Sequence, residues 1–419
     1  RTIIVEPVMI MLMVFGYPLS LLGQLFIVEK ITEELTGQNT VNVSVNSSVN
    51  QCEANKSDPE YILQDAIQKE SAFFMAMSSL VSGVPALFVT LFLGNYSDKV
   101  GRKFAILPPL VGTIAKCISY LLVINFKGSI WWLLLGSFAE GCGGFYVVAL
   151  MGCLSYIADI TKPEDRLFRI AIVEMCTFFS GLLGPIGVGY IIQGLGYFWP
   201  FLIVIGGYLI NMLYVVYFVP ETIRKDPEAR FLSVGHMKTT VFLFTRDNGS
   251  KRLWKMNVLI FSFFISTVVT MEMGTTTLFQ LNRPLCWDSI MIGYYSAASL
   301  GVATVGGAIL AKICKRCMRD SHIALLAGLT ATVRMVYTGF VQNTIMMFAA
   351  AALMPPAILY IPTLRTLLSK LVGDTEQGAV FGAIAFAEVV CSMLGSSVFN
   401  AVYASTVSLM TGFVFFVMA

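Results

Sequence analysis

The 419-residue chain is poor in charged side chains, because Asp, Glu, Lys and Arg together make up only 13% of it. Soluble globular proteins carry nearer a quarter. Hydrophobic residues reach 56%, and the mean hydropathy is +0.76. These values exclude an ordinary soluble domain and predict an all-α polytopic membrane protein embedded in a lipid bilayer. A net charge of +3 gives no reason to expect nucleic acid binding.

Several enzyme motifs are absent from the sequence. There is no glycine-rich phosphate loop ending in Lys-Ser/Thr, no Gly-x-Ser-x-Gly and no His-Glu-x-x-His. The only histidines, His236 and His322, form no ligand cluster, and the CxxC pair Cys314 and Cys317 lacks a second pair. We therefore expect no enzyme activity, no catalytic residue, no metal site and no bound cofactor.

Long apolar stretches divide the chain into two sets of six. A membrane-spanning helix needs about 20 apolar residues. The first set covers 3–27, 71–93, 104–126, 130–157, 167–193 and 198–219, and the second 256–281, 289–313, 322–342, 345–371, 378–404 and 406 onward. The sequence thus predicts a six-helix bundle over 1–219, a cytoplasmic linker over 220–255, and a second bundle over 256–419 whose last helix is cut short.

The distribution of Lys and Arg predicts the orientation. Positive residues near span ends are retained on the cytoplasmic side, and they gather after the second span (Lys99, Arg102, Lys103), in the linker and around Lys315. We therefore expect both termini to be cytoplasmic and segment 28–70 to be external. That segment holds three Asn-x-Ser sequons, which we expect to be glycosylated at Asn42, Asn46 and Asn55.

Only two of the nine cysteines fall on the predicted outer face, namely Cys52 in segment 28–70 and Cys286 after the seventh span. An outward-facing compartment favours oxidised thiols. We therefore expect a disulfide bond between Cys52 and Cys286.

Nine charged residues lie within the predicted spans, where a charge is costly unless it faces a cavity, a partner or a pathway. They are Glu6, Lys116, Glu140, Arg169, Glu174, Glu272, Arg334, Arg365 and Glu388. Position favours anchoring for Glu6, a structural or snorkelling role for Lys116 and Arg334, and a place in the loop for Arg169. The other predicted site residues are Glu174, Glu272, Arg365 and Glu388.

These four residues suit the binding of a proton and an anion. A carboxylate among apolar groups takes up a proton more readily than one in water, so a proton gradient can load and unload it. A guanidinium stays charged and holds a carboxylate or phosphate bidentately. We predict proton coupling by Glu174 and Glu388 and substrate binding by Arg365 and Glu272. The alternative is that each charge merely pairs across helices.

The loop from Gly94 to Lys103 reads Gly-x-x-x-Asp-x-x-Gly-Arg-Lys. It resembles the signature loop between helices 2 and 3 of the major facilitator superfamily, which implies twelve transmembrane helices in two six-helix bundles. The resemblance also suggests that Asp98 and Arg102 are cytoplasmic gate residues, with a plain solvated charge cluster as the alternative.

Further motifs resemble the solute carrier family of the proton-coupled folate transporter and its lysosomal paralogue. They are Val5-Glu6-Pro7, Phe168-Arg169-Ile-Ala-Ile-Val-Glu174, Pro284-Leu-Cys286-Trp-Asp288, Ile292-Gly293-Tyr294 and Leu368 to Gly378. In that family the matching positions supply a disulfide (Cys52 and Cys286), a proton-coupling glutamate (Glu174) and a functional arginine (Arg365). Phe145 and Val269 replace an aspartate and a histidine of the folate transporter, and Cys52 to Ser57 and Glu388 look more like the lysosomal paralogue.

The sequence thus predicts a symporter that moves organic anions, folate-like or conjugated catabolites, with protons as the coupling ion by alternating access. A proton-independent facilitator of small solutes and a non-transporting receptor or scaffold are the alternatives. We expect a monomer in the lysosomal or plasma membrane.

Overall fold

The computed structural model describes residues 4–37, 59–160, 184–222, 252–270, 273–371 and 377–419, and every regular element among them is helical. The first half contains α1 (Glu6–Thr36), α3 (Pro59–Val100), α4 (Lys103–Phe126), the short η2 (Ile130–Trp132), α5 (Leu133–Gly143), α6 (Phe145–Ile160), α8 (Gly184–Leu195) and α9 (Phe198–Phe218).

The second half repeats this alternation of long and broken helices. It contains α11 (Arg252–Thr270), α12 (Met273–Leu281), α13 (Ser289–Gly301), the π-helical turn η3 (Val302–Gly306), α14 (Gly307–Cys317), α15 (Asp320–Gly339), α16 (Thr344–Ala351), α17 (Met354–Ala357), α18 (Tyr360–Lys370), α19 (Gln377–Thr406) and α20 (Phe413–Met418).

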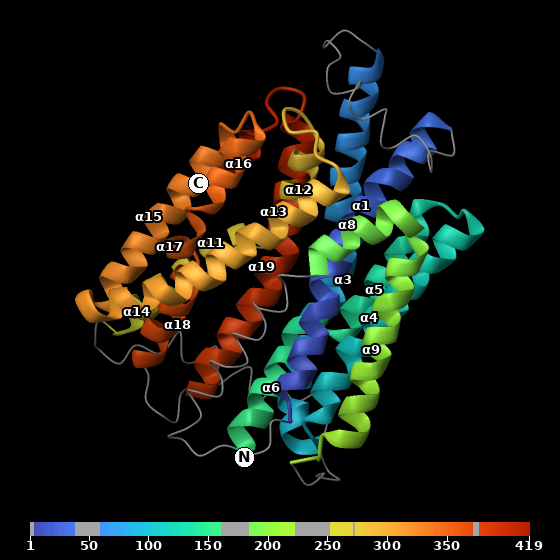
Figure 1. The fold of residues 1–419 in the computed structure, drawn as a ribbon. Helices are drawn as coiled ribbons and strands as arrows, with labels where there is room; N and C mark the ends of the chain where they lie inside the picture. The colour runs from blue at the N-terminus through green and yellow to red at the C-terminus, as the bar shows by residue number, and fades with distance from the viewer. Residues whose placement is uncertain (1–3, 38–58, 161–183, 223–251, 271–272, 372–376) are drawn as a thin grey trace.

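The two halves form two helical bundles that lie side by side (Figure 1). The blue-to-green elements make one bundle and the yellow-to-red elements the other, and they meet along α3 with α19 and α8 with α13. We call the end where α3 leads into α4 the motif end, and the end where α4 leads into η2 the opposite end.

Helix α9 shows how the sequence places a helix in the bundle. Its buried residues Phe201, Val204, Tyr208, Asn211 and Val215 recur every three to four positions, which puts them on one face of a helix. Two of them anchor this face to α1: the Tyr208 hydroxyl donates to the Leu12 carbonyl at 3.3 Å, and the Asn211 amide donates to the Val8 carbonyl at 3.1 Å. Polar groups in a bilayer need such internal partners.

Most of the predicted spans are present. Within the described ranges, nine helical stretches are long and apolar enough to cross a membrane. The predicted fifth span, 167–193, lies mostly outside the described residues, which include only its α8 part. The predicted spans starting at 322 and 406 correspond to α15 and α20, which are not among the nine, so the described residues leave the full count of twelve as a prediction.

Helices extend into the predicted external segment 28–70 from both sides. Helix α1 continues to Thr36 and α3 already begins at Pro59. Both extensions carry charged residues and lie beyond the predicted apolar spans, so the external position of this segment stays a prediction. Ion pairs between residues one helical turn apart join these charges, Lys30 with Glu33 at 2.9 Å and Lys69 with Asp65 at 2.8 Å.

The predicted fourth span is broken between α5 and α6. Gly144 has φ +87°, and the bulky Phe145 follows at φ +59°, a left-handed conformation that non-glycine residues rarely adopt. At Gly143 a Cβ atom would lie only 2.6 Å from the carbonyl oxygen of Pro108 on α4. The break turns Phe145 and Tyr146 toward the space between the bundles, where both line a cavity.

Candidate functional site

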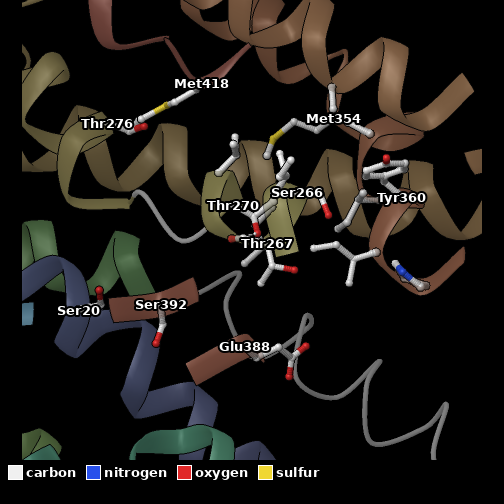
Figure 2. A pocket seen from close by; sticks show the side chains of 18 of the residues that line it. Ser20, Ser266, Thr267, Thr270, Thr276, Met354, Tyr360, Glu388, Ser392 and Met418 are labelled. Atoms are coloured by element: carbon white, nitrogen blue, oxygen red, sulfur yellow. Dashed lines mark hydrogen bonds between the residues drawn. The ribbon is translucent and has the colours of Figure 1, made fainter. Parts of the chain in front are cut away.

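A cavity of about 1480 Å³ lies between the bundles. Small-molecule sites in proteins typically occupy roughly 300–1,000 Å³, so this one has room for a large organic molecule. Figure 2 shows part of its wall, with Ser20 of α1, Ser266, Thr267 and Thr270 of α11, and Glu388 and Ser392 of α19 around one space. Much of the remaining lining is apolar.

On the C-terminal bundle, Arg365 and Glu388 form an ion pair between Nη2 and Oε1. Arg365 comes from α18 and Glu388 from α19, and the guanidinium carbon lies 5.8 Å from the centre of the Phe263 ring of α11. The side chains keep 27% and 12% of their surface exposed, and both line the cavity. A solute in the cavity can therefore contact either side chain without a prior rearrangement of the protein.

On the N-terminal bundle, Lys116 of α4 and Glu140 of α5 form a second pair, with Nζ 2.7 Å from Oε2. It too lines the cavity. Glycines bring the two helices close, since a Cβ atom at Gly136 would lie 2.0 Å from the Ser119 hydroxyl oxygen. This close approach sets Lys116 and Glu140 within reach of each other.

Among the described residues, the lining of the cavity has more cations than carboxylates. Among the described residues its charged members are Lys116, Arg334 and Arg365 against Glu140 and Glu388. Arg334 of α15 contacts the sulfur of Met335 at 3.9 Å, and no described carboxylate pairs with it. This excess of one positive charge among the described lining residues of a largely apolar cavity favours an anionic solute.

The bundles are joined toward the opposite end. The hydroxyls of Tyr190 (α8) and Tyr294 (α13) share a hydrogen bond. Further hydrogen bonds across the bundles are Gln193 to Asp288 at 3.2 Å, Thr277 to Gln24 at 2.5 Å, Tyr403 to Gln68 at 3.4 Å and Ser79 to Ser396 at 2.7 Å. These contacts hold the two bundles together on that side.

At the motif end the described ion pairs stay within one bundle. Arg102 binds Asp159 of α6 bidentately, with Nε–Oδ2 at 2.8 Å and Nη2–Oδ1 at 3.2 Å. The Glu221 carboxylate accepts from the backbone N–H groups of Arg102 at 2.7 Å and Lys103 at 3.3 Å. Thus the start of the predicted linker packs against the loop that carries the Gly-Arg-Lys sequence.

Several predicted site residues lie outside the described residues, namely Cys52, Glu174, Glu272 and the sequon residues Asn42, Asn46 and Asn55. Asp98 lies in α3, but its side chain is also outside what the structure describes. Cys286 is disulfide-bonded, whereas its pairing with Cys52 stays a prediction. Arg365 and Glu388, predicted for separate roles, lie in direct contact.

The sequence interpretation missed three partners of the charged residues. Glu140 was counted among the buried charges but given no role, and Asp159 and Glu221 were not considered as partners of Arg102. Glu140 follows Lys116 on the next span, and Asp159 and Glu221 each stand at a span end on the same side as Arg102. Charges at matching depth on neighbouring spans were the signal that could have found them.

The fold and the cavity define a multi-pass membrane transporter with two bundles. A model of the Major Facilitator Superfamily matches residues 9–396. The chain is 33% identical to the lysosomal proton-coupled steroid conjugate and bile acid symporter SLC46A3 of Bos taurus, over 99% of this chain and 91% of the relative. It is 27% identical to the proton-coupled folate transporter of Rattus norvegicus, over 87% and 79%.

Among solved structures, the chain is similar to the human organic anion transporter MFSD10 (TETRAN), with a TM-score of 0.69 and 15% identity over 99% of this chain and 96% of that one. This likeness supports the fold alone. The chain belongs to the Major Facilitator Superfamily, and within it to the solute carrier family of SLC46A3 and the proton-coupled folate transporter. These relatives are transporters and not enzymes.

Proposed function

We propose that this protein is a symporter that moves an organic anion together with protons across the membrane by alternating access. The observation behind the proposal is the Arg365–Glu388 pair on the wall of a large, mostly apolar cavity, whose described charged residues are three cations and two carboxylates. A guanidinium that a carboxylate covers can bind a substrate anion once that carboxylate is protonated. Proton uptake and anion binding then favour each other.

The proposed roles follow the sequence prediction. Glu388 and Glu174 couple to protons, Arg365 and Glu272 bind the substrate, and Asp98 and Arg102 belong to a gate at the motif end. Protons are the only coupling ion that this scheme needs. We place both termini and the motif end in the cytoplasm, with the protein acting as a monomer in the lysosomal or plasma membrane.

A conjugated apolar anion suits the cavity better than folate. Phe145 and Val269 replace two polar residues of the folate transporter, and both line the cavity. They make its wall more apolar in the middle of the membrane. Relatives named for steroid conjugates and bile acids are also more similar to this chain than the folate transporters in the comparison.

Uptake of labelled estrone 3-sulfate into proteoliposomes tests the proposal. An inward acid gradient should raise the initial rate several-fold, and Glu388→Gln should remove most of that stimulation. Asp65→Asn, a carboxylate paired with Lys69 on α3 and absent from the described cavity lining, is the matched control and should keep it.

The alternatives give different results in the same assay. Anion uptake that ignores the gradient would point to a proton-independent facilitator, and no uptake with binding retained would point to a receptor or scaffold. Either result would overturn the proposed symport.

A further inference from the structure

The cavity has two ion pairs on opposite walls, and the proposed function uses only one of them. Arg365–Glu388 belongs to the C-terminal bundle, and Lys116–Glu140 to the N-terminal bundle. Both pairs have a cation, a carboxylate and a partly exposed surface toward the same cavity. The second pair therefore has the composition of an anion site.

The Lys116 ammonium has donors to spare. An ammonium carries three N–H groups, and within the described residues Glu140 accepts one of them, at 2.7 Å. The Lys116 side chain keeps 22% of its surface exposed. Since it lines the cavity, the remaining donors can reach a solute there.

The helix contact beneath the pair does not depend on the pair itself. Gly112 and Gly136 bring α4 and α5 together, because a Cβ atom at Gly112 would lie 3.1 Å from the Glu140 Cα, and one at Gly136 would lie 3.1 Å from the Lys116 Cα. These glycines account for the close contact of the two helices, and the pair itself faces the cavity.

The other titratable groups beside the pair are a thiol and phenols. Cys117 and Tyr120 of α4 lie near Lys116, and Tyr208 of α9 lies near Glu140. A thiol and phenols are ordinarily neutral near pH 7. The described charges at this site are therefore one ammonium and one carboxylate.

The two cations lie at different depths. Lys116 is the fourteenth residue of α4, roughly 20 Å from its start at the motif end, and Arg365 stands five residues, roughly 7.5 Å, before the end of α18 at the same end. The two cations thus stand on different bundles and at different distances from the motif end of their own helices. An elongated solute with an acidic group at each end suits this placement better than two acidic groups on one small moiety.

We propose that Lys116 is a second substrate anchor and that the preferred substrate is an elongated dianion, with one acidic group at Arg365, the other at Lys116 and an apolar body between them. This inference rests on the proposed function and specifies its substrate class. Such a dianion bridges the two bundles, so its binding draws them together.

Three probes separate the possibilities when they compete with labelled estrone 3-sulfate for uptake. Lithocholate 3-sulfate has acidic groups at both ends of a rigid apolar body, lithocholate has one, and folate has two carboxylates on one glutamate. We expect lithocholate 3-sulfate to compete about tenfold better than lithocholate, which is the effect of one charge-assisted hydrogen bond. Folate should compete no better than lithocholate, because its two carboxylates lie too close together to reach both cations.

Three variants test whether the preference for lithocholate 3-sulfate over lithocholate depends on Lys116. Lys116→Met combined with Glu140→Met removes the pair without leaving a buried charge, and should bring the ratio between the two bile acids to about one. Glu140→Gln leaves the ammonium without its carboxylate and should raise the preference for lithocholate 3-sulfate. Arg334→Gln removes a cation of the same cavity from the other bundle and should leave the ratio unchanged.

Other outcomes contradict the proposal. A double variant that keeps the wild-type ratio, or a ratio lost in Arg334→Gln instead, would exclude Lys116 as the anchor. If the double variant does not fold, Glu140→Gln decides, since a structural pair predicts lower thermal stability and no gain for the dianion. Thermal shifts of the solubilised protein with each bile acid measure the same preference as binding, without transport. A protein that prefers the dianion but shows no proton-dependent uptake would contradict the proposed symport and not the role of Lys116.

Discussion

The two ends of the molecule hold their helices together in different ways. Toward the opposite end, hydrogen bonds join one bundle to the other, as between Tyr190 and Tyr294 and between Gln193 and Asp288. At the motif end, the described ion pairs join helices of the same bundle, Arg102 with Asp159 and Lys370 with Asp320. In the proposed alternating access, the first kind of contact must break when one bundle rocks against the other, whereas the second kind need not.

A covalent bridge between the two bundles at the opposite end should therefore lower uptake more than any other change considered below. In a variant with Tyr190→Cys and Tyr294→Cys, a short bifunctional methanethiosulfonate should lower uptake by about tenfold or more, because the proposed alternating access requires these helices to separate. Cys142 and Cys317, which are free and exposed, are replaced by Ser beforehand. Reduction of the bridge should restore the rate.

The matched control applies the same bridge at the motif end. Asp320→Cys with Lys370→Cys joins α15 to α18 inside one bundle, and uptake should stay within about twofold of the unbridged variant. Equal inhibition by both bridges would show that the two ends do not differ as the hydrogen bonds indicate.

Much of this architecture could be predicted from the sequence. Apolar runs of about 20 residues give the spans, and nine of them match described helical stretches that are long and apolar enough to cross a membrane. The signature loop predicted the fold class, since its glycines and charges are tied to one helix junction. The helical ends of α1 and α3 were not predicted, because local ion pairs let a helix continue past its apolar part.

The pairing of charges within the cavity could not be predicted in the same way. Sequence gives the depth of Lys116 and Arg365 along their helices, but not the rotation of each helix about its axis. That rotation depends on close contacts such as the one at Gly136, which face a particular neighbour. Glu388 was therefore given a role of its own, although it lies against Arg365.

The second prediction compares two ion pairs at the motif end. Arg102 is largely buried and binds Asp159 through two hydrogen bonds, so a double-mutant cycle with Arg102→Ala and Asp159→Ala should give a coupling of about 1–3 kcal/mol. Thermal and denaturant unfolding in detergent measures it. A coupling near zero would mean that the loop is held by Glu221 instead.

The cycle on Lys370 and Asp320 is its control. The Lys370 side chain is 64% exposed, and exposed pairs contribute only about 0–1 kcal/mol. We therefore expect a coupling below that of Arg102 with Asp159. A larger coupling for Lys370 with Asp320 would contradict the expectation that the ion pair of the signature loop is the stronger of the two.

The smallest effect is expected from a single hydroxyl at the opposite end. Tyr190→Phe removes the hydrogen bond to Tyr294 but keeps the ring contact, whose centroids lie 6.2 Å apart. A neutral hydrogen bond contributes about 0.5–1.5 kcal/mol, and less where water competes. The fraction of molecules in which the bundles are separated at the opposite end should therefore rise about two- to fivefold. The Ser20→Cys variant places a thiol in the cavity. Its rate of modification by an impermeant thiol reagent added at the opposite end measures this fraction.

Tyr217→Phe is the matched change at the other end of the same bundle. Tyr217 is 76% exposed on α9 and does not line the cavity, so its replacement should leave the modification rate of Ser20→Cys unchanged. If Tyr190→Phe also leaves it unchanged, the remaining contacts between the bundles, such as Thr277 with Gln24, hold the opposite end closed without the tyrosine pair. The barrier to opening then lies nearer the middle of the membrane, where α3 meets α19.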